Sequence, residues 1–317
     1  MVTDKNPDLS IVILNYNVRK LLLNCLDSIF KNKTSKDNWQ VIVVDNASSD
    51  GSVEAVKSLR SHLRGGKLIE IIESKGNLGF SGGNNLAIPY IKAPVVLFLN
   101  PDTIIVGDVI QKSLEKLLSS PEYGALTCKV ELPDGKLDYS CHRGFPTPWN
   151  SLAYFSGLSK MFPHSSLFSG YTASYLDVNK AHEIDCCTGA FLMVRKIAAE
   201  QIGYWDTDYF WNGEDIEFCY SLKEKARLPD GQGWKIYYYP EVKIIHYKGS
   251  SSGLWSFAKQ VVQKDVKVKS VRHATDAMRI FYMKHFYPKY PPLFRDLILL
   301  GIKLLENYRK AKIWIYQ

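Results

Sequence analysis

The feature that most constrains this chain is a regular alternation of apolar runs and helix-like stretches between residues 9 and 132. The apolar runs are rich in Val, Ile and Leu and end in turn residues, which is typical of buried strands; the stretches between them have helical spacing. The expected strands, the second with a turn cluster at its end, cover residues 9–17, 39–52, 67–74, 94–100 and 123–132. The expected helices cover residues 18–30, 52–63, 79–91 and 108–120. We therefore predict an α/β fold with a mostly parallel central sheet flanked by helices.

This alternation lapses after about residue 133. Residues 133–183 are rich in Ser, Tyr, Phe, Pro and Gly with weak periodicity, and a loop of that length usually carries function or moves. Order returns at "EIDCCTGAFLMVRK" (183–196) and continues to the strand-like "WKIYYYPEVKIIHY" (234–247). We expect these elements to belong to one domain that spans residues 1–253.

The positive charge of the chain is concentrated near its end. The net charge is +8, and from Leu254 onward 13 Lys and Arg face 4 Asp and Glu, a net of +9. The other residues carry 27 basic and 28 acidic side chains, so they are almost neutral. We therefore expect a basic helical extension over residues 254–317.

Within this extension, residues 294–308 have the spacing of an amphipathic helix. One face is expected to hold Leu293, Ile298, Leu299, Ile302 and Leu305. Basic amphipathic helices with aromatic residues bind anionic membrane surfaces. The alternatives are that these helices pack on the main domain or form a homodimer contact.

Cysteine usage and the absence of a leader-like segment indicate a cytoplasmic protein. The six cysteines form no C-x-x-C pair, and Cys186 and Cys187 are neighbours in the sequence, so we expect reduced, buried thiols. The polar start "MVTDKNPDLS" does not resemble a signal peptide, and no uncharged apolar run approaches the ~20 residues of a membrane span. Peripheral attachment to the cytoplasmic face of a membrane is compatible with this interpretation.

Polar residues follow four successive predicted strands. They are Asn15, Tyr16 and Asn17 after the first strand, Asp45 and Asn46 after the second, Asn77 after the third, and Asn100 and Asp102 after the fourth. Any one of them is explained equally well as a turn residue. Four such groups at one edge of a parallel sheet favour a ligand-binding crevice, because ligands bind at the carboxyl ends of such strands.

Three further segments contain residues suited to chemistry. The glycine-rich "KGNLGFSGGNN" (75–85) matches neither nucleotide-binding fingerprint, although its glycines would let the backbone approach a ligand. "WNGEDIEFC" (211–219) places three carboxylates at a helix start, where they either cap the helix or act as a general base. His246 ends a strand and is either a structural histidine or a metal ligand.

Taken together, these segments resemble glycosyltransferase family 2, which has the nucleotide-sugar-binding GT-A fold. The resemblance runs from about Leu9 to Gly253. It rests on seven segments in the expected order: "SIVILNYN", "VIVVDNASSDGS", "NLGFSGGNN", "FLNPD", "TGAFLMVRK", "GYWDTDYFWNGEDIEFC" and "IIHYKGSS". This version resembles the rhamnosyltransferase-like branch, whose members build bacterial surface polysaccharides from dTDP-rhamnose or related donors.

The resemblance implies a role for each matching position. Residues that bind the nucleotide-sugar donor would be Asn15, Tyr16, Asn17, Asp45, Asn77, Gly79, Gly82, Asn84, Asn100 and Asp102. Asp102 and His246 would hold Mg²⁺ or Mn²⁺ on the donor diphosphate. Asp215 would be the catalytic base of an inverting transfer, with Glu214 beside it. Residues near the acceptor would be Gly189, Ala190 and Trp211.

The chain departs from the family pattern at one position of the metal-binding D-x-D element. Asn100 replaces the first Asp, and a neutral amide adds no charge to a metal site. The implied acceptor is a saccharide, free or linked to a polyprenyl diphosphate. One alternative is a homologue that only binds sugar nucleotides. We expect no nucleic-acid partner, because binding through the basic tail would leave "WNGEDIEFC" unexplained.

Overall fold

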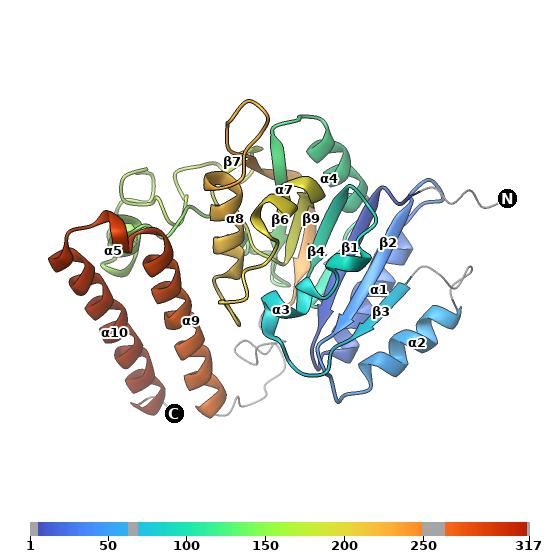
Figure 1. Ribbon diagram of the computed structural model, residues 1–317, viewed down its shortest axis with the longest axis horizontal. Helices are drawn as coiled ribbons and strands as arrows, with labels where there is room; N and C mark the ends of the chain where they lie inside the picture. Colours follow the sequence, from blue (N-terminus) through green and yellow to red (C-terminus); the bar gives the residue numbers. More distant parts are fainter. Residues whose placement is uncertain (1–5, 63–68, 249–263, 316–317) are drawn as a thin grey trace.

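The computed structural model describes residues 6–62, 69–248 and 264–315. Its centre is a mixed sheet with the strand order β3-β2-β1-β4-β8-β6-β9-β5, in which β7 also pairs with β9 (Figure 1). The strands are β1 (Leu9–Asn15), β2 (Trp39–Asp45), β3 (Ile69–Glu73), β4 (Val95–Leu99), β5 (Thr103–Ile105), β6 (Tyr123–Glu131), β7 (His182–Ile184), β8 (Phe191–Arg195) and β9 (Lys235–His246).

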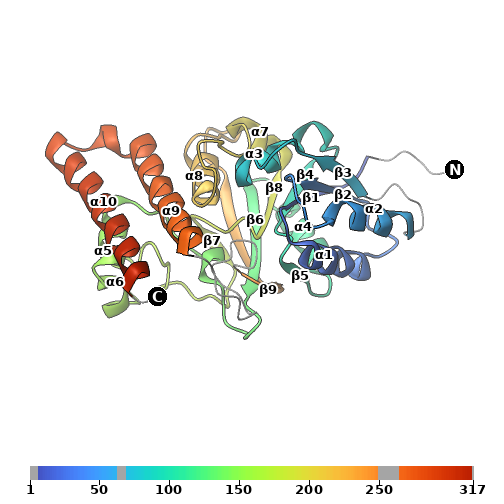
Figure 2. The same ribbon diagram turned by 90° about the horizontal axis from the view of Figure 1, so that it is seen from below.

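Helices flank this sheet and continue beyond it (Figure 2). They are α1 (Arg19–Asn32), α2 (Ser52–His62), α3 (Gly79–Asn85), α4 (Val109–Leu118), α5 (Pro148–Phe155), α6 (Leu158–Met161), α7 (Lys196–Ile202), α8 (Glu214–Glu224), α9 (Lys264–His285) and α10 (Pro292–Ile315). Short 3₁₀ helices lie at Ile88–Tyr90, Tyr139–Cys141 and Tyr287–Lys289. The predicted α/β class is confirmed.

The first four strands form the parallel part of the sheet. Ile13 of β1 pairs with Val43 of β2 on one side and with Leu99 of β4 on the other. Helices cover both faces here, which explains why these strands read as continuous apolar runs. β1 ends at Asn15, two residues earlier than expected, because Asn17 has a left-handed φ of 54° and turns the chain.

The second part of the sheet is mixed and brings distant segments together. β8 pairs antiparallel with both β4 and β6, and β9 runs parallel to β6. β5, which is three residues long, pairs antiparallel with the last residues of β9. Such a short strand carries no periodic signal in the sequence, so its pairing could not be predicted.

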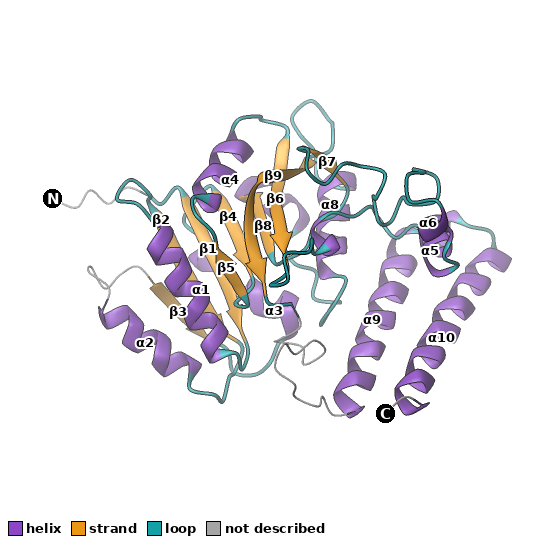
Figure 3. Ribbon diagram, turned by 180° about the vertical axis from the view of Figure 1, so that it is seen from behind, coloured by secondary structure: helices purple, strands orange, loops and turns teal. Residues whose placement is uncertain are grey.

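The C-terminal helices pack on the α/β core and on each other. α9 and α10 lie side by side, and α9 lies next to α8 (Figures 1 and 3). Ala277 and Phe281 of α9 are buried. A Cβ atom on Gly213, the residue before α8, would stand 2.9 Å from the Cβ atom of Ala277. The predicted boundary between residues 253 and 254 lies outside the described residues.

The prediction of a single apolar face on α10 was incomplete. Ile298, Leu299 and Ile302 of the expected face pack against the core. A second set of apolar side chains on the same helix is exposed: Leu293, Phe294, Leu297, Leu300, Leu304 and Tyr308. We call this set the outer face of α10. No helix among the described residues is long and apolar enough to cross a membrane.

Candidate active site

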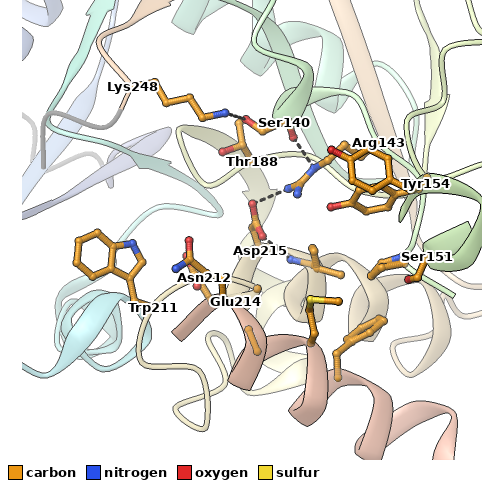
Figure 4. Close-up of a pocket in the computed structure, with 18 of the residues that line it drawn as sticks. Ser140, Arg143, Ser151, Tyr154, Thr188, Trp211, Asn212, Glu214, Asp215 and Lys248 are labelled. Atoms are coloured by element: carbon orange, nitrogen blue, oxygen red, sulfur yellow. Dashed lines mark hydrogen bonds and ion pairs between the residues drawn. The ribbon is translucent and has the colours of Figure 1, made fainter. Parts of the chain in front are cut away.

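A cavity of about 510 Å³ lies at the start of α8. Its walls come from the turn after β4, the loop after β6, α5, the first turn of α8, the end of β9 and the two C-terminal helices. Figure 4 shows Asp215 in contact with Arg143, with Lys248 on one side of this pair and Tyr154 and Ser151 on the other. The cavity therefore joins segments that are far apart in the sequence.

The pairing of β5 with β9 brings Asp102 and His246 together. Thr103 lies opposite His246 in the register, and the backbone amide of Tyr247 donates a 2.8 Å hydrogen bond to the carbonyl oxygen of Asp102. Asp102 Oδ1 lies 3.2 Å from His246 Nε2, and both side chains are almost completely buried. Among the described residues, this Oδ1 atom has no hydrogen-bond partner.

A second carboxylate lies on the other side of the His246 ring. Asp138 Oδ2 stands 3.1 Å from His246 Nδ1, and Asp138 Oδ1 stands 2.6 Å from the ammonium group of Lys248. Burial disfavours a charged ring, but the contacts with Asp102 and Asp138 outweigh it and raise the pKa of His246 to about 9. The contacts with His246 and Lys248 likewise hold the pKa of Asp138 well below its usual value, despite burial.

That Asp102 and His246 hold a divalent cation stays a prediction. Two ligands at about 2.1 Å from one ion and at a right angle stand about 3 Å apart. The separation of 3.2 Å between the buried Asp102 Oδ1 and His246 Nε2 agrees with that geometry. The described residues contain no group of three or more His, Cys, Asp or Glu side chains able to hold a metal. Further ligands would therefore come from water and donor phosphates, as is usual for Mg²⁺.

The first turn of α8 presents Asp215 to the cavity. Asn212 and Gly213 have positive φ angles of 69° and 85°, and the resulting tight turn starts the helix. Asp215 Oδ2 accepts a 2.7 Å hydrogen bond from the guanidinium group of Arg143. Each of these side chains is 15% exposed, so the carboxylate is held in place and still faces the cavity.

Glu214, the neighbour of Asp215, has a different environment. Its Oε2 atom is buried and has no hydrogen-bond partner within the described part of the chain. Burial, and then the nearby charge of Asp215, raise the pKa of Glu214 well above its usual value. Of the two carboxyl groups, Asp215 is the better placed to accept a proton from a group in the cavity, because its carboxylate is the more exposed.

Glu217, one turn further along α8, connects this helix to α9. Its Oε2 atom accepts hydrogen bonds from the hydroxyl of Tyr209 at 3.0 Å and from Nε2 of His285 at 2.6 Å. Its Oε1 atom accepts a 2.8 Å bond from Ser221. Burial would raise the pKa of Glu217, but the contact with His285 outweighs it and lowers the value to about 2. Glu217 therefore holds α9 against the helix that carries Asp215.

The strand ends of the parallel half form a separate network. Asn15 Nδ2 donates to Asp45 Oδ1 at 2.8 Å and to the hydroxyl of Ser48 at 3.0 Å. Asp45 Oδ2 accepts a 2.8 Å bond from the amide of Ser48, and Asn17 Oδ1 accepts a 2.7 Å bond from the amide of Ser49. The structure thus brings together Asn15, Asn17 and Asp45. Contact of Asp45 with the nucleotide-sugar donor stays a prediction; both of its oxygens already accept hydrogen bonds from the protein.

The glycine-rich segment is fixed to the same edge. Asn46 Oδ1 accepts a 2.9 Å bond from the amide of Leu78, and its Nδ2 atom donates to Asn77 Oδ1 at 3.0 Å. Gly79 has a φ of +72°, and a Cβ atom there would stand 2.3 Å from the carbonyl oxygen of Phe210. Gly79 is therefore required where α3 meets the loop before α8.

The other predicted donor residues lie around this segment. A Cβ atom on Gly82 meets only the Cβ atom of Leu78, at 3.0 Å. Asn84 is buried and donates to the carbonyl oxygen of Phe80 within its own helix at 3.0 Å. Tyr16 is exposed at the strand edge. Asn100 lines the cavity together with Asp102.

The predicted acceptor residues divide between the core and the cavity. Trp211 lines the cavity, and so does Thr188. Gly189 and Ala190 are not among the described residues that line it. The missing Cβ atom of Gly189 would stand 2.9 Å from the ring of Phe80, and Ala190 is fully buried. That these two residues meet the acceptor stays a prediction.

Sequence reasoning missed four charged residues of the cavity region. Asp138 and Arg143 come from the weakly periodic segment after β6, Lys248 follows β9, and Arg309 comes from α10. Only Lys248 lies in one of the quoted segments, "IIHYKGSS", and the resemblance gave it no role. The available signals were the unusual length of the loop and the concentration of basic residues in the tail.

Similar solved structures define the fold. The mannosyltransferase PcManGT from Pyrobaculum calidifontis, solved with GDP-Man and Mn²⁺, aligns over 98% of this chain and 74% of its own, with a TM-score of 0.57 and 16% identity. GalNAc-T7, solved with UDP, GalNAc and Mn²⁺, aligns over 85% of this chain and 48% of its own, with a TM-score of 0.55 and 12% identity. The architecture is therefore that of the GT-A glycosyltransferases, as expected from the sequence.

The family model for glycosyl transferase family 2 matches residues 10–203, and the chain belongs to this family of enzymes. The hexosyltransferase Agl10 of low-salt glycan biosynthesis in Haloferax volcanii is 30% identical over 69% of this chain and 62% of its own. The rhamnosyltransferase WbbL of Escherichia coli is 27% identical over 75% of this chain and 82% of its own. An N-acetylglucosaminyl-diphospho-decaprenol L-rhamnosyltransferase of Mycobacterium tuberculosis is 24% identical over 67% of this chain and 68% of its own. The resemblance to the rhamnosyltransferase-like branch is confirmed.

Proposed function

We propose that this glycosyltransferase moves a sugar from a nucleoside diphosphate donor to a hydroxyl group of a saccharide acceptor, with inversion at the anomeric carbon. The observation that carries the proposal is that Asp215 lines the same cavity as Asp102 and His246. A carboxylate for the acceptor proton and a pair of ligands for a diphosphate-bound cation are the two devices that such a transfer needs.

In this proposal Asp215 acts as the base. A carboxylate oxygen has more than one lone pair, so Asp215 Oδ2 can accept from the acceptor hydroxyl while Arg143 holds it. The hydroxyl oxygen forms a bond to the anomeric carbon, its proton moves to Asp215, and the bond to the diphosphate breaks with its electron pair on the leaving oxygen. When bound at Asp102 and His246, Mg²⁺ or Mn²⁺ would supply positive charge for that leaving group.

The donor proposal follows the relatives. Rhamnosyltransferases are among them, so dTDP-rhamnose is the first donor to test and the biosynthesis of a surface polysaccharide is the proposed role. A thermal-shift panel of UDP-, GDP- and dTDP-sugars with Mg²⁺ or Mn²⁺ tests it. A donor at 100 times its Kd stabilises the chain by about 2.7 kcal/mol. No shift in melting temperature with any donor would refute the proposal. Donor binding without sugar transfer would indicate a homologue that only binds sugar nucleotides.

The acceptor side of the proposal includes a membrane surface. One relative is named for a lipid-linked acceptor, and the outer face of α10 carries apolar side chains such as Leu297, Leu304 and Tyr308, which are 53%, 58% and 66% exposed. Lys303 and Lys312 are exposed on the same helix, and the tail from Leu254 onward has a net charge of +9. Apolar and basic side chains on one helix fit an anionic lipid surface.

Flotation with vesicles tests this surface. We expect the full chain to bind vesicles that contain anionic lipid and to bind less at high salt. The double variant Leu297→Ser/Leu304→Ser should bind at least about tenfold more weakly, because each leucine loses its burial in lipid. Ile197→Ser, which removes an equally exposed side chain on α7, is the matched control. The proposal would be contradicted if the full chain did not bind anionic vesicles. It would also be contradicted if a dimer contact covered the outer face of α10.

A further inference from the structure

Part of the cavity wall comes from the two C-terminal helices, α9 and α10. Arg309 of α10 and Met278 and Phe281 of α9 line the same cavity as Asp215. The guanidinium carbon of Arg309 lies 5.7 Å from the ring centre of Phe155 in α5. Figures 2 and 3 show α5 and α10 close together, at the opposite end of the molecule from β1 to β3.

Arg309 differs from the other cations of the cavity because none of the described carboxylates pairs with it. Arg143 pairs with Asp215, and Lys248 pairs with Asp138. The acid nearest to Arg309 in the sequence, Glu306, pairs with Lys310 instead. Within the described part of the chain, no hydrogen bond or ion pair involves Arg309, and its contact is with the Phe155 ring.

The position of Arg309 separates it from the expected metal site. Asp102 and His246 come from the sheet side of the cavity, whereas Arg309 comes from the helical side, and Asp215 is contributed by α8 between them. A guanidinium group stacked on an aromatic ring keeps its N–H groups free at its edge. These groups match the oxygens of a phosphate.

Arg309 lies on the same helix as the outer face of α10. Tyr308, its neighbour in the sequence, belongs to that face and is 66% exposed. If the outer face rests on lipid, the same helix holds a cation in the cavity at the level of the membrane surface. The phosphate groups of a membrane-bound molecule lie at that level.

We propose that Arg309 binds the phosphate group through which the acceptor saccharide is attached to its lipid. The inference rests on the proposed function and deepens it, because it assigns the anionic head of the acceptor to one residue. The saccharide would then extend from Arg309 along the cavity toward Asp215. Phe155 and Met278 would contact the apolar parts of the acceptor.

A pair of acceptors tests this assignment. The first carries the saccharide on a short prenyl chain through a diphosphate, and the second carries the same saccharide on an alkyl chain without phosphate. We expect Arg309→Gln to raise KM for the first acceptor about tenfold or more at unchanged kcat, since a charge-assisted hydrogen bond is lost. KM for the second acceptor should not change. Arg309→Lys should recover part of the loss, and Lys112→Gln on α4, where the lysine side chain is 51% exposed and outside the cavity, should behave like the wild type.

Three outcomes would overturn the inference. Equal changes in KM for both acceptors would mean that Arg309 serves packing, and a change in KM for the donor alone would mean that it binds the donor diphosphate. Equal affinity of the wild type for inorganic diphosphate and for the prenyl-linked acceptor would show that the site binds free diphosphate and does not recognise the acceptor. A melting curve for each variant confirms folding.

Calorimetry separates this inference from the proposed function. Binding of the prenyl diphosphate acceptor to the full chain is measured without any donor. Wild-type binding that Arg309→Gln weakens supports the inference even if no donor reacts. Absence of wild-type binding overturns it even if sugar transfer to the neutral acceptor is observed.

Discussion

The two sides of the cavity region are built in different ways. On the proposed donor side, Asn15 and Asp45 are the last residues of adjacent parallel strands and lie 30 residues apart in the sequence. On the acceptor side, Arg143 and Asp215 lie 72 residues apart, and Glu217 and His285 lie 68 residues apart. The proposed donor side is the product of one repeated βα unit, whereas the proposed acceptor side is assembled from a long loop and the helices α5, α8, α9 and α10.

This difference indicates how each side should respond to substitution. The donor edge is locked by short hydrogen bonds between neighbouring strand ends, so a change there disturbs the sheet itself. The acceptor side depends on contacts between whole helices, such as that of His285 with Glu217. We therefore expect replacement of loops and helices to change the acceptor side more readily than the strand edge, since ligand-binding residues concentrate on connecting segments.

The largest effect is expected from Asp215→Asn, which should lower the rate of transfer without changing the affinity for the donor. Asparagine keeps the shape of the side chain and an oxygen for Arg143 but loses the basic carboxylate, so kcat should fall about 10²–10⁴-fold. Affinity for the donor should not change, because the donor edge is untouched. Steady-state rates and donor titrations check this, with Asp230→Asn in an exposed loop as control. Near-normal turnover would reject Asp215 as the base.

Glu217→Gln should weaken the contact between α8 and α9 and leave the strand edge with Asn15 and Asp45 unchanged. The folded pKa of about 2 lies below the ordinary value of about 4.3 for glutamate, so the ionised form stabilises the fold by about 3 kcal/mol at neutral pH. This stability is present above the ordinary pKa and is lost as pH falls from about 4.3 toward 2. The variant should therefore be less stable than the wild type at pH 7, with a smaller difference at pH 3.

Urea unfolding at several pH values measures this difference, and Glu224→Gln, exposed on the same helix, is the matched control. Nucleotide binding should persist in the variant at temperatures where it remains folded. A loss of stability that is the same at pH 3 and pH 7 would show that Glu217 acts through packing rather than charge.

Asp138→Asn tests whether the loop after β6 contributes to the expected metal site. Asp138 comes from the loop after β6, yet its contact with His246 Nδ1 orients the ring toward Asp102. Loss of a carboxylate that orients a metal-binding histidine typically weakens metal affinity about 10–100-fold. We expect such a loss for Mn²⁺ binding in the presence of nucleotide, measured by calorimetry, and a larger loss for Asp102→Ala.

The control for this measurement is Asp134→Asn, whose carboxylate is exposed and pairs with Lys136. Unchanged Mn²⁺ affinity in Asp138→Asn would show that the His246 ring needs no support from the loop. The donor side would then be complete without any contribution from the segment after β6.

Much of the fold could be predicted because its signals are local. Apolar runs such as that before Asn100 are long enough to show periodicity, and the turn residues after them mark the binding edge. The same reasoning failed for β5, because three residues have no period. It was also incomplete for α10, whose apolar residues occupy both a packed face and an exposed one.

The sequence by itself determined the α/β class, the family and the order of the motifs that carry Asp45, Asp102, Asp215 and His246. These features depend on residues near one another in the chain. Only the tertiary structure decided their partners: Asp138 behind His246, Arg143 on Asp215, and Arg309 in the cavity wall. Contacts between residues 72 and 108 positions apart are set by how helices and strands pack, and packing leaves no spacing in the sequence that would predict them.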